Sequence, residues 1–249
     1  MKVIAVTNNK GGVGKTTSCL NIAGGLAKLG KKVLTIDMDA QANLTISYGI
    51  SEKTQNHIGR VLLKELSFDE AVHKVGKVDV LPSSHSMIAL EKKLVEETLS
   101  ELFLKRALNT VKDKYDYVII DCGPNLGKLT ANALCAATDF IVPIHTEFFS
   151  FKGIQTLFSF AQNVKDMINP DIKLMGILLT KYNENTRTAV HKQVASNIKN
   201  SGNKVFESYI RQNIALSESP MAAKDIFDYA PDSNGADDYL ELCKEIINS

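Results

Sequence analysis

A glycine-rich run near the start of the chain constrains the fold more than any other feature. The short β-branched segment Lys2–Thr7 leads through two asparagines into Lys10–Thr17, which reads K-G-G-V-G-K-T-T, and a segment of helical period follows. A strand, a glycine-rich loop and a helix in this order are typical of a phosphate-binding P-loop. The alternative is an ordinary tight turn between a strand and a helix, but so many glycines ahead of Lys-Thr are rare by chance.

Each residue type in this loop suits one part of a bound phosphate chain. Glycines allow consecutive backbone N–H groups to converge on one phosphate, and the N-terminus of the following helix adds a partial positive charge. Lys15 supplies a mobile ammonium for the β- and γ-phosphate oxygens, and Thr16 would offer its hydroxyl to Mg²⁺. The residues expected to bind the nucleotide here are Lys10, Gly11, Gly12, Val13, Gly14, Lys15, Thr16 and Thr17.

The rest of the chain alternates apolar β-branched runs with longer segments of helical period. This pattern predicts an α/β fold, with a mostly parallel twisted sheet and helices on both faces. Its 249 residues fit a single P-loop domain over 1–249. The expected strands are Lys2–Thr7, Lys32–Asp37, Lys77–Pro82, Tyr117–Asp121, Phe140–Ile144, Leu174–Thr180 and Lys204–Tyr209. The expected helices are Lys15–Leu29, Ser86–Lys112, Leu129–Ala137, Lys152–Ile168, Thr188–Asn200 and Ala236–Ile247, with short helices over Ser47–Val75 at the edge of the sheet.

Composition excludes several classes of protein. Lys and Arg number 29 against 28 Asp and Glu, so any surface for nucleic acid has to be a local patch. The four cysteines are widely spaced without a C-x-x-C pair, as in a reduced cytosolic protein. The first residues turn polar too soon for a signal peptide or a membrane-spanning helix.

Two further segments place carboxylates where strands are expected to end. Asp37 and Asp39 are two residues apart, so both point to the same side and can order Mg²⁺ waters or an attacking water. Asp121 ends the apolar run Tyr117–Asp121, which is the form of a Walker B aspartate that holds Mg²⁺ through water. We therefore expect Thr16, Asp39 and Asp121 to form the metal site. For Asp37 and Asp39, the alternative is a pair of Asp residues that only caps the next segment.

Together these segments resemble the ParA/MinD superfamily of P-loop ATPases. The form K-G-G-x-G-K-T-T looks like the deviant Walker A loop of that superfamily. Val33–Thr45 is similar to its D-x-D-P-Q-x-N-x-T stretch, with Ala40 and Ala42 in place of Pro and Gly, and Gly123 stands where Pro is usual. The further matches are with segments 179–183, 210–220 and 229–239. They make the chain more similar to the ParA/Soj partition branch than to MinD.

The resemblance implies roles for particular residues. Lys10 would reach the nucleotide of the partner subunit in a face-to-face dimer, and Lys15 would be the ordinary P-loop lysine. Asp39 would position the hydrolytic water, so Lys10, Lys15 and Asp39 are the expected catalytic residues. In relatives, residues near Asn183 and Asn213 lie beside the adenine. The alternative for both is an ordinary turn asparagine.

The resemblance also implies a function. Such proteins are slow ATPases that use ATP and Mg²⁺, form a homodimer on binding ATP, and bind DNA non-specifically until hydrolysis releases them. The implied role is partition of plasmid or chromosome DNA by a cytoplasmic protein that is associated with the nucleoid when ATP-bound. A centromere-binding or cargo adaptor protein is the expected partner and the expected stimulator of hydrolysis. We expect no stable membrane association.

Charge is unevenly distributed in the C-terminal part of the chain. Residues 181–211 hold six basic and two acidic side chains, whereas residues 212–249 hold two basic and eight acidic ones. A basic strip can contact DNA phosphates without reading bases. The residues expected to contact DNA are Arg187, Lys192, Lys199, Lys204 and Arg211. The alternative is a solvated charged face.

Three other functions are alternatives. A MinD-like or cargo-positioning ATPase would use a membrane or protein surface, but the acidic segment Tyr239–Ser249 suits anionic lipid poorly. A reductase of the nitrogenase iron-protein branch needs paired cysteines for a shared iron–sulfur cluster, and Cys122 and Cys135 do not lie in that context. A nucleotide-sensing scaffold would turn over ATP negligibly, which an ATPase assay with and without DNA distinguishes.

Overall fold

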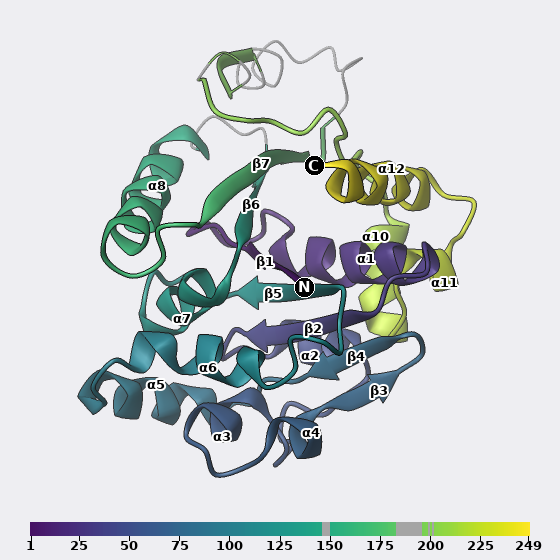
Figure 1. Ribbon diagram of the computed structural model, residues 1–249. Coiled ribbons are helices and arrows are strands. Elements are labelled where there is room, and N and C mark those ends of the chain that lie inside the picture. Colours follow the sequence, from purple (N-terminus) through teal and green to yellow (C-terminus); the bar gives the residue numbers. More distant parts are fainter. Residues whose placement is uncertain (146–149, 183–195, 199, 201) are drawn as a thin grey trace.

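The computed structural model is built on a seven-stranded sheet, and it describes residues 1–145, 150–182, 196–198, 200 and 202–249 (Figure 1). The strand order is β3-β4-β2-β5-β1-β6-β7, and every neighbouring pair is parallel except β3 with β4. The strands are β1 Lys2–Val6, β2 Val33–Met38, β3 His73–Val75, β4 Val78–Leu81, β5 Tyr117–Cys122, β6 Asp139–His145 and β7 Lys173–Thr180. The predicted α/β fold with a mostly parallel sheet is confirmed.

Helices cover both faces of this sheet. Side chains alternate along each strand, so Ile4 and Val6 join the apolar cluster beneath α1, whereas Val3 and Ala5 join the cluster on the opposite face. Helices α1, α2, α10, α11 and α12 pack on the first face, and α3 to α8 pack on the second. The helices are α1 Lys15–Lys28, α2 Asn43–Ser47, α3 Ile58–Leu62, α4 Phe68–Ala71, α5 Met87–Glu96, α6 Phe103–Asn109, α7 Lys128–Ala136, α8 Ser150–Met167, α10 Ala215–Glu218, α11 Ile226–Tyr229 and α12 Asn234–Asn248.

The strand order brings the candidate functional residues to one edge of the sheet. β1 lies between β5 and β6, and β5 also pairs with β2. In this register Asp37 of β2 pairs with Asp121 of β5, and Asp121 also pairs with Val6 at the end of β1. The loop after β1 therefore begins beside both carboxylates, at the carboxyl edge where open α/β sheets bind ligands.

The prediction of one long helix over Ser86–Lys112 is wrong. The structure divides it, because α5 stops at Glu96 and α6 begins only at Phe103. Between them the Ser100 hydroxyl donates to the Leu94 carbonyl at 2.6 Å. This bond gives a carbonyl at the helix end a partner other than the next helical turn, so the chain can leave the helix there.

The prediction of a strand over Lys204–Tyr209 is also wrong. The segment and its flanking residues make only two isolated bridges to β7. The backbone N–H groups of Glu207 and Ser208 instead donate to the Glu245 carboxylate of α12, at 2.9 and 3.0 Å. Those donors are therefore not available for a strand ladder.

The remaining elements differ from expectation in smaller ways. Within Ser47–Val75 the short helices α3 and α4 are confirmed, but the antiparallel edge strand β3 was not predicted, because three residues are too few to show a period. The predicted helix Thr188–Asn200 lies largely outside the described residues. The other predicted strands and helices are confirmed, with their ends displaced by a few residues.

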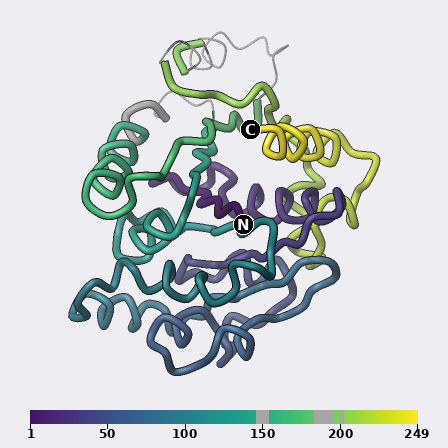
Figure 2. Tube along the Cα trace, in the orientation of Figure 1, coloured from purple at the N-terminus to yellow at the C-terminus, as the bar shows by residue number. Residues whose placement is uncertain are grey.

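Helix α12 returns the end of the chain to its beginning and packs on α1 (Figure 2). The Lys2 Nζ atom donates to the carbonyl of Ser249 at 2.9 Å. Gly25 of α1 lies so close to α12 that an added Cβ would be 2.6 Å from the Cys243 sulfur. The helix that follows the glycine-rich loop is thus held in direct contact with the C-terminal helix.

Gly25→Ala is expected to lower the free energy of unfolding by about 1–3 kcal/mol, because the added methyl group overpacks against Cys243 and Phe227. Gly11→Ala is the control, since a Cβ there meets no atom within 4 Å. Urea denaturation followed by circular dichroism measures both variants. A Gly25→Ala variant within about 0.5 kcal/mol of the parent would contradict the close packing of α1 on α12.

Candidate functional site

The glycine-rich loop adopts a backbone conformation that its glycines permit. Gly12 and Gly14 have φ angles of 72° and 89°, a region in which a residue with a Cβ atom is strained. Helix α1 begins immediately afterwards at Lys15, and Gly14 has no side chain with which to cap it. The first N–H groups of α1 are thus left for an anion such as a phosphate.

Hydrogen bonds to neighbouring strands hold the loop at both ends. The Asn8 Nδ2 atom donates to the Pro143 carbonyl of β6 at 2.7 Å, and its Oδ1 accepts from the Lys10 N–H at 3.0 Å. The Thr180 hydroxyl, at the end of β7, donates to the Val13 carbonyl at 2.9 Å. The shape of the loop is therefore set before a ligand arrives, which lowers the ordering cost of binding.

The two lysines of the loop occupy different environments. Lys15 is buried, and its Nζ atom donates to the Lys10 carbonyl at 3.1 Å. An ammonium on a flexible stem can exchange such a carbonyl for a phosphate oxygen with little rearrangement. Lys10 is half-buried at the entrance of the loop. The structure therefore places the Lys15 ammonium within the loop.

Thr16 and Asp121 are in direct contact. The Thr16 hydroxyl donates to Asp121 Oδ2 at 2.7 Å. Asp121 is fully buried, and its Oδ1 atom has no hydrogen-bond partner among the described residues. Burial raises the pKa of Asp121, and the nearby Asp37 carboxylate raises it further. A hard cation such as Mg²⁺ would give the second oxygen a partner and stabilise the ionised form, so these residues fit a magnesium site.

Asp37 is occupied by hydrogen bonds within the protein. Its Oδ1 atom accepts from the Asp39 N–H at 3.0 Å, and its Oδ2 accepts from the N–H and the hydroxyl of Thr45 at 2.9 and 2.7 Å. Burial raises the pKa of Asp37 to about 6, although the Thr45 hydrogen bonds oppose the shift. Asp37 thus ties the end of β2 to helix α2.

Asp39 lies on the loop between β2 and α2, and Ser83 of another segment holds this loop by a hydrogen bond. Asp39 Oδ1 accepts from the Gln41 N–H at 3.0 Å, and the Ser83 hydroxyl donates to the Asp39 backbone carbonyl at 2.7 Å. A Cβ added at Gly123 would lie 3.1 Å from Asp39 Oδ1. The side chain therefore lies against the loop that follows Asp121. The sequence analysis did not identify Ser83 as a site residue. Its contact joins the loop after β4 to the loop after β2, and sequence spacing does not reveal such a contact.

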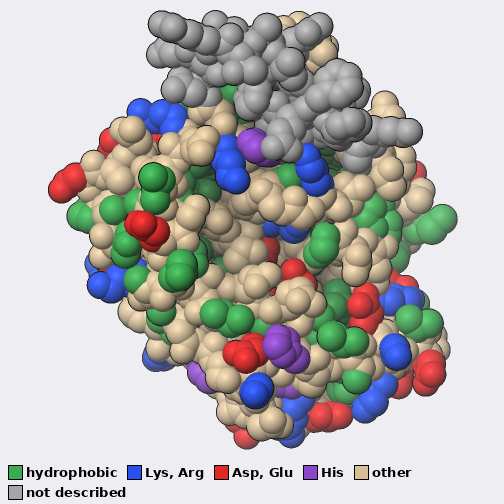
Figure 3. All heavy atoms as spheres, turned by 180° about the vertical axis from the view of Figure 1, so that it is seen from behind, with side chains coloured by type: hydrophobic (Ala, Val, Ile, Leu, Met, Phe, Trp, Pro, Cys, Tyr) green, Lys and Arg blue, Asp and Glu red, His purple; other side chains and the backbone are tan. Residues whose placement is uncertain are grey.

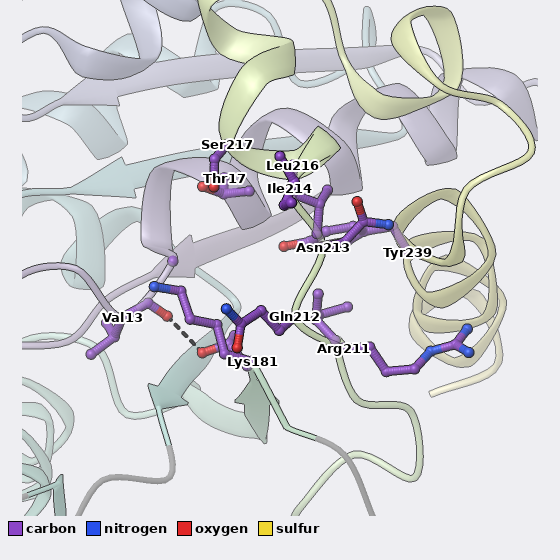
Figure 4. Close-up of a pocket in the computed structure, with 13 residues that line it drawn as sticks. Val13, Thr17, Lys181, Arg211, Gln212, Asn213, Ile214, Leu216, Ser217 and Tyr239 are labelled. Atoms are coloured by element: carbon purple, nitrogen blue, oxygen red, sulfur yellow. Dashed lines mark hydrogen bonds between the residues drawn. The ribbon is translucent and has the colours of Figure 1, made fainter.

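A cavity of about 150 Å³ adjoins the loop (Figure 4). Val13, Gly14 and Thr17 line it from the side of the loop, and residues 210–214, 216 and 217 line much of the rest. Asn213 is among the lining residues, and its Oδ1 accepts from the N–H of Ala215, the first residue of α10. Asn183 lies outside the described residues. A cavity next to a phosphate-binding loop is a suitable place for the base of a nucleotide.

The structure describes two of the residues predicted to contact DNA. Lys204 is exposed. Arg211 is paired with α12, since its Nη2 atom lies 2.6 Å from Asp238 Oδ1, and Figure 4 shows the guanidinium directed toward that helix. This ion pair uses part of the Arg211 guanidinium within the protein, and the contact of Arg211 with DNA stays a prediction. Arg187, Lys192 and Lys199 lie outside the described residues.

The surface seen from behind carries charge of both signs. In Figure 3 the Lys and Arg side chains are interspersed with Asp and Glu over the described part of that face.

Among the described residues, none of the helices combines the length and the apolar character needed to cross a bilayer.

Comparison with known proteins identifies relatives along the whole chain. A family model described as an AAA domain matches residues 1–174. The chain is 38% identical over 249 residues to the sporulation initiation inhibitor protein Soj of Bacillus subtilis, and the match covers 98% of each chain. It is 37% identical to the chromosome-partitioning ATPase Soj of Thermus thermophilus, over 98% of this chain and 94% of that protein.

A solved structure with bound ADP and magnesium has a similar fold. It is the cobyrinic acid a,c-diamide synthase of Mycobacterium smegmatis, with a TM-score of 0.87 and 31% identity, and the match covers 100% of this chain and 94% of that one. These matches include both the glycine-rich loop and the C-terminal elements that line the cavity beside it. The chain therefore belongs to the ParA/Soj family of P-loop ATPases.

Proposed function

We propose that this protein binds ATP and Mg²⁺ between the P-loop, Asp39 and Asp121, and that slow hydrolysis controls its attachment to DNA during partition. The contact of Thr16 with Asp121 carries the proposal, because the second Asp121 oxygen has no partner among the described residues and suits a cation. The M. smegmatis relative was solved with ADP and magnesium, which supports the same ligands here.

The P-loop and Lys15 bind the phosphates. The N–H groups of Gly11–Thr17 and the Lys15 ammonium hold the β- and γ-phosphates. Thr16 and Asp121 would hold the metal. When bound, Mg²⁺ offsets the negative charge that gathers on the phosphate oxygens as the terminal bond breaks.

Asp39 orients the attacking water. Its carboxylate accepts a hydrogen bond from the water and directs it toward the γ-phosphate. Asp37 holds the Asp39 N–H and Ser83 holds the Asp39 carbonyl, so the backbone on either side of the water-binding group is fixed.

Partition requires that the ATP state differ from the ADP state in what it binds. We infer that two ATP-bound copies dimerise, with Lys10 of each copy acting on the nucleotide of the other, as the family resemblance implies. Dimerisation would double the basic strip that includes Lys204 with Arg187, Lys192 and Lys199, and DNA would then bind without sequence preference. A centromere-binding or cargo adaptor protein would stimulate hydrolysis and release the DNA. The protein would act in the cytoplasm and on the nucleoid.

Lys15→Ala is expected to weaken ATP binding by about 100-fold or more, because the ammonium opposite the β- and γ-phosphates is lost. Lys10→Ala is expected to bind ATP nearly as the parent does but to stay monomeric. Equilibrium nucleotide titration and light scattering measure the two properties. An ATP-dependent dimer of Lys10→Ala would contradict the role of Lys10 across the interface, and tight ATP binding by Lys15→Ala would contradict the P-loop assignment.

Asp39→Ala is expected to bind ATP normally and to lower kcat by about 10²- to 10⁴-fold, because the group that orients the water is lost. Gly123→Ala should lower kcat less, since its Cβ would press on Asp39 at 3.1 Å and displace it slightly. Single-turnover phosphate release measures both. Hydrolysis at the parental rate by Asp39→Ala would show that this residue is structural.

DNA binding is expected to need ATP and to weaken with salt. A dimer that uses about four to six phosphate contacts should give a slope of log K against log salt of about −4 to −5. Lys192→Glu with Lys199→Glu should weaken binding to all DNA sequences alike, whereas Lys92→Glu with Lys93→Glu, on the exposed side of α5, should not. Fluorescence anisotropy with ATP present measures this. Unchanged affinity in the first pair would place the DNA surface elsewhere, and no DNA binding by the parent would favour a protein or membrane surface.

A further inference from the structure

The Asp238 carboxylate on α12 accepts hydrogen bonds from both the backbone and the side chain of Arg211. Asp238 Oδ2 accepts from the Arg211 backbone N–H at 2.8 Å, and Oδ1 accepts from the Arg211 Nε and Nη2 atoms at 2.9 and 2.6 Å. Asp238 is only 9% exposed. The Arg211 Nε atom also donates to Oδ2, at 3.1 Å. A planar guanidinium held by both carboxylate oxygens has one orientation, so this contact fixes the backbone and the side chain of Arg211 together.

A second carboxylate on the same face of α12 holds the preceding part of the segment. Glu245 lies two helical turns after Asp238, and its carboxylate accepts the N–H groups of Glu207 and Ser208. On the other side, the Ile210 N–H donates to the Leu179 carbonyl of β7 at 2.9 Å. Residues 207–211 are therefore held between α12 and β7 without forming a strand.

This held segment leads directly into the wall of the cavity beside the P-loop. Arg211 and Asn213 line that cavity, and Tyr239, the neighbour of Asp238 on α12, lines it too (Figure 4). The Tyr239 hydroxyl also lies 3.1 Å from the Ser18 hydroxyl of α1. Helix α12 thus contacts both the wall of the cavity and the helix that begins at the P-loop.

We propose that Asp238 and Glu245 are positioning residues that set the wall of the base pocket, so that they control affinity for the base of the nucleotide and not the chemistry at its phosphates. The proposal rests on the proposed nucleotide function, with the base in the cavity beside the loop. The Arg211 guanidinium points away from the phosphate site and toward α12, so its loss should not act on the phosphates directly.

Asp238→Asn is the main test, because Asn keeps the shape of the side chain and removes its charge. It should raise the KM for ATP roughly 5- to 20-fold and reduce the preference for ATP over GTP, with kcat and the inhibition constant of inorganic tripolyphosphate within about twofold of the parent. Tripolyphosphate occupies the loop but has no base. Glu245→Gln should change the same quantities in the same direction.

Two neighbouring acids on α12 serve as matched controls. Asp237→Asn and Glu241→Gln remove the same charge from exposed positions of the same helix, and neither should change any of these quantities. Arg211→Lys is a second variant if Asp238→Asn fails to fold, since Lys keeps the charge but cannot make the two-pronged contact. It should raise the KM for ATP as Asp238→Asn does.

Two outcomes would overturn the proposal. An unchanged KM for ATP in Asp238→Asn would show that the contact does not position the pocket, and an equal weakening of ATP and tripolyphosphate would show a general structural effect. Ser217→Tyr tests separately whether the base lies in this cavity, because a Tyr at this exposed lining position would fill it. If Ser217→Tyr leaves ATP binding unchanged, the base does not lie there and the proposal falls with that assignment. If only Ser217→Tyr weakens ATP binding, the role of α12 alone is wrong.

Discussion

Two carboxylates buried side by side are the constraint on which this site depends. Asp37 and Asp121 occupy the same register on β2 and β5, and both side chains are fully buried. Like charges this close are costly away from water unless hydrogen bonds or cations compensate them. Asp37 is compensated by hydrogen bonds from Asp39 and Thr45, whereas Asp121 accepts one from Thr16. Stabilisation of ionised Asp121 therefore depends on the Lys15 ammonium and on a bound cation.

This dependence connects the phosphate site to the loop that carries Asp39. The Asp37 carboxylate raises the pKa of Asp121, and Asp37 directly holds the Asp39 N–H and the first turn of α2. A cation beside ionised Asp121 would offset the negative potential at Asp37 as well, so both carboxylates could stay ionised. The same loop is fixed from the other side by Ser83, which follows β4. Three neighbouring strands thus contribute to the placement of the Asp39 carboxylate, which we propose orients the attacking water.

Much of this arrangement could be predicted from the sequence where its signals are contiguous. The P-loop and the strand that ends at Asp121 are continuous patterns, and their positions at one edge follow from a parallel sheet. Contacts between distant residues could not be predicted, because spacing carries no sign of them. The bond from Thr180 to Val13 and the pair of Arg211 with Asp238 are of this kind. The end of α5 at Glu96 was not predicted for a related reason. Apolar residues recur beyond the residue where the helix stops, so the sequence pattern does not mark its end.

The charge asymmetry near the C-terminus shows how a sequence count can report on internal structure. The basic excess of residues 181–211 and the acidic excess of residues 212–249 suggest two separate surfaces. In the structure, however, Asp238 and Glu245 of the acidic part hold residues 207–211 of the basic part, by one ion pair and several bonds to backbone N–H groups. A carboxylate bonded to backbone N–H groups keeps its charge while it fixes a segment. The two excesses are thus partly complementary within one molecule, because carboxylates of the acidic part hold the described end of the basic part.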